Sequence, residues 1–161
     1  RYIVSELLGS KQEKALTIAY ARVSSHDQKE DLRRQELVLE SYCASKGFDF
    51  EIISDLGSGM NYKKRGLIRL IKLICSNQVD RLVLTHKDRL LRFGSELIFS
   101  LCEHFACEVI VINRSDDSTF EEDLANDVLE IITVFSARLY GSRSHKNKAL
   151  VEQLKAVAKD L

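Results

Sequence analysis

Short apolar segments alternate along the chain with longer segments in which apolar residues recur every three or four positions. Apolar runs of strand length occupy residues 16–24, 48–54, 80–85 and 108–113. Helical spacing of apolar residues occupies 31–46, 66–76 and 95–105. Strands that alternate with helices are typical of a parallel sheet covered by helices, so the pattern predicts an α/β fold.

The longest helical pattern lies at the end of the chain. Thr119 and Glu122 have the spacing of a capping box, and apolar residues then recur every three or four positions, with one polar interruption, as far as Leu161. A continuous helix of about 40 residues would be roughly 60 Å long at 1.5 Å per residue. Because that length exceeds the width of the preceding domain, the pattern predicts that a partner chain covers the helix.

These elements divide the chain into three parts. Residues 15–120 carry the predicted sheet, 121–161 form the predicted oligomerisation helix, and 1–14 are a short amphipathic piece and a polar linker. The 161 residues are 45% hydrophobic and 30% charged, which is typical of a folded domain with its own core. No apolar run is long enough for a membrane span, so we expect no membrane partner. The four cysteines lack the spacing of a zinc site, so we expect reduced thiols, a cytoplasmic protein and no metal.

Charge is segregated on a chain whose formal net charge is +0. The charged residues within 61–94 are mostly basic, whereas residues 116–130 carry acids and no base. Such segregation gives a neutral protein a basic face that suits nucleic acid.

Candidate chemistry lies at the ends of two predicted strands. Arg22, Ser24 and Ser25 end the first strand, and KDRLLRFG, residues 87–94, follows the third. Ligands of parallel α/β sheets bind beyond the carboxyl ends of the strands, so we expect these segments to meet. Guanidinium groups bind phosphate oxygens in pairs, so arginines beside a serine suit attack on a phosphodiester. The absence of a G-x-G-x-x-G or Walker pattern argues against a nucleotide cofactor.

Three segments together resemble the serine recombinases, the resolvase and invertase superfamily. YARVSSHDQ at 20–28 resembles the nucleophile motif of that family, KDRLLRFG at 87–94 resembles its Asp-Arg-x-x-Arg motif, and DLGSGMNYKKRGL at 55–67 resembles its mobile loop. Residues 126–148 are most similar to insertion-sequence serine transposases, which carry their DNA-binding domain at the N-terminus. The resemblance implies a resolvase-like, mostly parallel sheet and a long dimerisation helix. Residues 1–14 would be the remnant of the DNA-binding domain.

The resemblance also assigns the reacting groups. Ser24, directly after the valine, would be the nucleophile that forms a 5′-phosphoserine link with DNA, without a cofactor. Alternation along a strand agrees, since it points Arg22 and Ser24 to one side and Ser25 to the other. Arg22 would bind the scissile phosphate, and Arg89 and Arg92 would complete its cage. The i, i+3 spacing puts these two arginines on one face if they begin a helix.

Other residues would support this site. Gln28 and Gln35 match residues that organise it, with Gln35 placed toward DNA. Asp88 would either orient arginines or protonate the leaving 3′ oxygen. The family usually has an arginine where this chain has Lys64, which cannot form a bidentate fork, so either Lys64 or its neighbour Arg65 would complete the cage.

The predicted helix would also contact DNA. A basic stretch supplies the candidate phosphate contacts, Arg138, Arg143, Lys146 and Lys148. The resemblance implies dimers through this helix and an active tetramer that cuts the DNA of two sites in transposition. Two alternatives remain from the sequence: a site-specific resolvase or invertase with the same active site, and a catalytically silent DNA-binding assembly protein.

Overall fold

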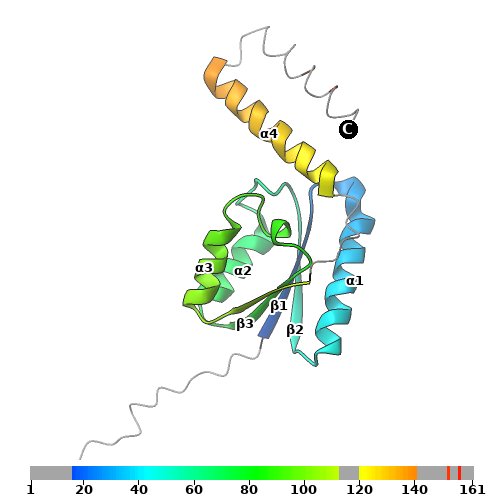
Figure 1. Cartoon of the computed structure of the whole chain (residues 1–161), viewed down its shortest axis with the longest axis vertical. Coiled ribbons are helices and arrows are strands. Elements are labelled where there is room, and N and C mark those ends of the chain that lie inside the picture. Colours follow the sequence, from blue (N-terminus) through cyan, green and yellow to red (C-terminus); the bar gives the residue numbers. More distant parts are fainter. Residues whose placement is uncertain (1–15, 113–119, 141–151, 153–155, 157–161) are drawn as a thin grey trace, which may run out of the picture.

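A four-stranded parallel sheet forms the centre of the molecule (Figure 1). The structure is a computed structural model that describes residues 16–112, 120–140, 152 and 156. The strands are β1 (Leu16–Val23), β2 (Phe50–Leu56), β3 (Val79–Leu84) and β4 (Glu108–Val111). Their order in the sheet is β2-β1-β3-β4. The parallel α/β fold predicted from the alternating pattern is confirmed.

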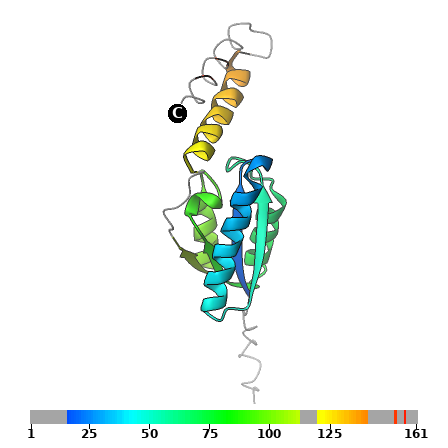
Figure 2. The ribbon, with the colours of Figure 1, turned by 90° about the vertical axis from the view of Figure 1, so that its right-hand side faces the viewer.

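Helices cover both faces of this sheet (Figures 1 and 2). One face carries α1 (Lys29–Ser45), and the other carries α2 (Arg65–Cys75) and α3 (Ser95–His104). Strand alternation divides β1 between the two layers: Ala19 and Ala21 pack with α1, whereas Ile18 and Tyr20 pack in the core below α2 and α3. Among the described residues, no helix is long and apolar enough to cross a membrane.

The boundary between α1 and β2 differs from the prediction. The apolar run was expected to form a strand from Phe48, but β2 begins at Phe50. Gly47 has a φ of +66°, and the amides of Gly47 and Phe48 donate to the carbonyl oxygens of Ala44 and Cys43. These two bonds form a Schellman motif that ends α1. Because Phe48 takes part in this motif, β2 starts only at Phe50.

Three loops meet at the carboxyl edge of the sheet. The chain passes from β1 to β2 on one side and then to β3 on the other side of β1, so the loops after these strands flank one crevice. The last described long helix, α4 (Phe120–Tyr140), starts at this edge and extends away from the sheet (Figures 1 and 2). Continuity of this helix through 141–161 and the proposed remnant at 1–14 lie outside the described residues.

Asp55, at the end of β2, fixes the loop that leads to α2. Its two carboxylate oxygens accept from the amides of Gly66 and Leu67 at 2.9 and 2.8 Å, and one also accepts from the hydroxyl of Tyr20 at 2.8 Å. A Cβ on Gly66 would lie 2.7 Å from Asp55 and from Ile53, so only glycine fits there. These contacts cap the start of α2 and hold the 57–64 loop at the carboxyl edge.

Candidate active site

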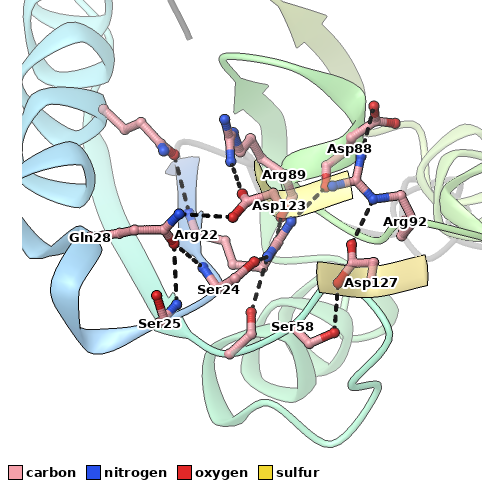
Figure 3. Close-up of polar contacts among 12 residues, drawn as sticks. Arg22, Ser24, Ser25, Gln28, Ser58, Asp88, Arg89, Arg92, Asp123 and Asp127 are labelled. Carbon is pink, nitrogen blue, oxygen red and sulfur yellow. Dashed lines mark hydrogen bonds and ion pairs between the residues drawn. The ribbon is translucent and has the colours of Figure 1, made fainter. Parts of the chain in front are cut away.

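Ser24 lies at the exit of β1, where neighbouring side chains hold its backbone and its hydroxyl (Figure 3). The Arg22 guanidinium donates to Ser24 Oγ at 3.0 Å. The side-chain oxygen of Gln28 accepts from the amides of Ser24 and Ser25 at 3.0 and 3.2 Å. The hydroxyl of Ser25 instead donates to Asp27 on the exposed side of the turn. The structure therefore directs only Ser24 toward the arginines.

Arg22 is completely buried and ties three loops together. Besides Ser24, its guanidinium donates to the carbonyl oxygens of Gly57, Asp88 and Arg89 at 3.0, 3.2 and 3.1 Å. Burial lowers the pKa of Arg22, and the carboxylates of α4 oppose that shift. In this arrangement the side chain shapes the site from beneath, because most of its donors are used by backbone carbonyls.

Arg89 and Arg92 do not begin a helix, so the condition on which they would share a helical face is not met. Arg89 ends a short 3₁₀ turn (Lys87–Arg89), and α3 begins only at Ser95, after Gly94 with a φ of +80°. Arg92 therefore lies in the connection between the two. Both side chains nevertheless reach the same carboxyl edge, and both are buried there rather than exposed on a basic face.

Two aspartates of α4 bind these arginines. Arg89 Nη1 lies 2.7 Å from Asp123 Oδ2, and Arg92 Nε lies 2.6 Å from Asp127 Oδ2. Our sequence analysis missed both aspartates as site residues. Their i, i+4 spacing within the acidic segment was a usable signal, since it places them on one helical face opposite a chain segment rich in arginine.

Lys64, rather than Arg65, points into the site. Lys64 is buried, and its ammonium donates to the carbonyl oxygens of Ser58 and Asn61 at 3.0 and 2.8 Å. Burial, reinforced by the nearby charge of Arg22, lowers the pKa of Lys64 to about 8. Arg65 is exposed at the first position of α2. Lys64 therefore supplies a cation at this position whose pKa is about 8.

The remaining predicted residues fall into two groups. Gln35 is buried and accepts from the Arg22 amide at 3.3 Å, so it organises the strand rather than facing DNA as expected. Asp88 keeps its carboxylate 24% exposed, 3.5 Å from Arg92 Nη1. The predicted DNA contacts of the last helix have side chains outside the described residues, Arg138, Arg143, Lys146 and Lys148. Within the described ranges, no cluster of acids, histidines and cysteines could hold a metal ion.

Comparisons with known proteins agree with this arrangement. The family model "Resolvase, N terminal domain" matches residues 17–154. A putative resolvase of Acanthamoeba polyphaga mimivirus is 36% identical over 92% of this chain and 75% of its own length. The crystal structure of the C-terminal catalytic domain of ISC1926 TnpA, an IS607-like serine recombinase, is 39% identical, with a TM-score of 0.80 over 88% of this chain and 97% of that one. A serine recombinase from Sulfolobus solfataricus is 44% identical, with a TM-score of 0.73 over 86% and 97% of the two chains. The chain therefore belongs to the resolvase N-terminal domain family, and its fold is that of a serine recombinase catalytic domain.

Proposed function

We propose that this chain is the catalytic domain of a serine transposase, which cuts and rejoins DNA through a 5′-phosphoserine at Ser24. The observation that carries the proposal is the contact between the Ser24 hydroxyl and the Arg22 guanidinium, at an edge that also holds Lys64, Arg89 and Arg92. Similarity to IS607-like serine recombinases supports the role in transposition.

The proposed reaction exchanges one phosphodiester for another. The Ser24 oxygen attacks phosphorus, an Oγ–P bond forms, and the bond from phosphorus to the 3′ oxygen breaks. The serine proton passes to solvent, and the leaving 3′ oxygen takes up one proton, for which the partly exposed Asp88 carboxyl is the candidate relay from solvent. Guanidinium groups stabilise the added negative charge of the transition state. Because the bond energy remains in the phosphoserine, rejoining requires no ATP.

Covalent trapping tests this proposal. A nicked DNA duplex that carries transposon ends lets the cut strand diffuse away, so the phosphoserine accumulates. We expect a denaturant-stable adduct whose tryptic peptide carries the nucleotide on Ser24. An adduct mapped to any other residue, or none with cognate ends and a full-length protein, would contradict the proposal.

The exposed face of α4 supports assembly into dimers and tetramers. Leu124, Val128 and Phe135 are exposed and lie on one side of the helix, as spacings of four and seven residues require. Four DNA strands at two sites need four serines, and therefore four copies of this chain. We propose that copies pair through this face, since an uncovered apolar stripe of this kind is unfavourable in water.

Placing a charge on this face is expected to dissociate the assembly. Val128→Asp puts a carboxylate in the centre of the apolar stripe, where pairing would desolvate it. Sedimentation at micromolar concentration should show dimers for the unmodified chain and a monomer for the variant. Leu97→Asp is the matched control, because Leu97 is 67% exposed on α3, outside the stripe. Equal dissociation in both variants, or in neither, would argue against pairing through α4.

The pH dependence of cleavage should report Lys64. Its pKa of about 8 means that the ammonium is charged below this pH and neutral above it. We expect DNA cleavage to fall as pH rises through 8, and Lys64→Arg to retain activity to higher pH because arginine stays charged. Measuring adduct formation from pH 6.5 to 9.5 checks this. Arg65→Lys should keep the pH profile of the unmodified chain. If Lys64→Arg also left the profile unchanged, Lys64 would not be part of the phosphate cage.

Site-specific resolution is the second candidate, favoured by relatives that are named putative resolvases. The two functions share the chemistry and differ in the position of the DNA-binding domain. We expect the full-length protein to carry that domain before the catalytic domain. A domain that follows α4 would favour resolution or inversion.

A further inference from the structure

The arginines of the site are bound by carboxylates of the same chain. Asp123 and Asp127, on successive turns of α4, are 0% and 1% exposed and bind donors from three different loops (Figure 3). Each aspartate uses both oxygens. The donors are Gln28 Nε2 at 3.1 Å and Arg89 Nη1 at 2.7 Å for Asp123, and Ser58 Oγ at 2.8 Å and Arg92 Nε at 2.6 Å for Asp127.

These donor sets suit a phosphodiester equally well. A carboxylate and a phosphodiester each offer two oxygens that share one negative charge, and guanidinium groups bind both. The same donors cannot bind both groups at once. A DNA phosphate and the aspartates of α4 therefore compete for the same arginines.

Burial excludes DNA from these arginines while α4 is docked. Arg22 and Arg89 are 0% and 2% exposed, and the Arg92 side chain is 5% exposed. The site holds four basic side chains, and removing the two carboxylates would leave Asp88 and Asp55 as the acids of the sheet domain nearest to them. The site thus gains two units of positive charge when the start of α4 departs.

We propose that Asp123 and Asp127 occupy the position of the scissile phosphate and keep the site closed until the start of α4 is drawn away. This inference rests on the proposed function, because it takes DNA phosphate as the competing ligand. A partner chain that binds the apolar stripe and repositions α4 moves both aspartates away from the arginines, because both aspartates lie on this helix. The catalytic groups are thereby unavailable in a chain that has not assembled.

Asparagine at both positions tests the inference. Asp123→Asn with Asp127→Asn keeps the size of the side chains and removes their charge. We expect inorganic phosphate to bind this variant at least about tenfold more tightly than it binds the unmodified chain, because the competing state is depopulated. Amides of 120–137 should exchange hydrogen faster, and adduct yield on trapping DNA should rise. Glu103→Gln is the matched control, because Glu103 is an exposed acid near the end of α3, and it should change none of these.

The outcomes separate this inference from the proposed function. Unchanged phosphate affinity in the double variant would overturn it, and so would reduced adduct yield, which would mean that the aspartates hold the arginines in a productive position. If no form of the protein made adducts, the proposed function would fail, while phosphate binding and hydrogen exchange would still decide whether α4 closes the site.

A milder variant guards against loss of the fold. Ser58→Ala removes the hydrogen bond to Asp127, together with the one that Ser58 Oγ accepts from the Met60 amide, and leaves every charge in place. Protection of the β1 amides reports whether each variant is folded. We expect Ser58→Ala to bind phosphate about twofold more tightly, and no change in a folded Ser58→Ala protein would contradict the inference.

Discussion

Replacing Ser24 by alanine is expected to lower the yield of covalent protein–DNA adduct by more than about 10³-fold, since the proposed nucleophile is removed. The Ser24 hydroxyl is the one that the Arg22 guanidinium contacts, whereas the Ser25 hydroxyl faces Asp27. Quantifying denaturant-stable adduct on trapping DNA over time gives the rate for each variant.

Ser25→Ala is the control for this change, because it removes a neighbouring hydroxyl of the same turn. We expect its adduct rate to stay within about threefold of the unmodified chain, as for other exposed substitutions outside the reacting groups. The opposite pattern, with adducts that persist in Ser24→Ala and vanish in Ser25→Ala, would refute the assignment of the nucleophile.

Replacing Arg22 by methionine should damage both stability and activity. Methionine replaces the aliphatic stem of arginine, but it leaves the carbonyl oxygens of Gly57, Asp88 and Arg89 buried without their donor. We expect the free energy of unfolding to fall by about 3–5 kcal/mol, because each buried group that loses its partner costs about 1–3 kcal/mol and some of it is regained by rearrangement. Urea denaturation measures the change, and adduct formation should be lost even where the variant is folded.

Arg33→Met controls for the loss of a charged side chain. Arg33 is exposed on α1 and pairs along the helix surface with Glu36. Its replacement should change the free energy of unfolding by no more than about 0.5 kcal/mol. Similar effects of the two substitutions would mean that the carbonyl contacts of Arg22 contribute little.

The sheet and the common side of Arg22 and Ser24 could be predicted because both depend on local patterns. Alternating short and helical apolar spacing defines the order of the elements. Strand alternation alone puts Arg22 and Ser24 on one side, as observed in their 3.0 Å contact. The carboxyl-end rule then brings the loop at 87–94 to the same edge.

The partners of Arg89 and Arg92 could not be predicted in the same way. Their aspartates lie 34 and 35 residues further along the chain, on a helix whose docking depends on how it leaves the sheet. The two arginines do not begin a helix, which was the condition for a common helical face, because α3 starts only after Gly94. The sequence showed that acids and bases are segregated, but not that Asp123 and Asp127 of the acidic segment pair with Arg89 and Arg92 of the basic one.

Gln28 connects α4 to the turn that holds Ser24. One amide group joins two parts of the site, since its oxygen holds the amides of Ser24 and Ser25 while its nitrogen donates to Asp123 of α4. A displacement of α4 removes the acceptor from one end of this amide and so changes the restraint on the backbone of Ser24 at the other end. The position of the long helix and the order of the serine turn are therefore coupled through a single side chain.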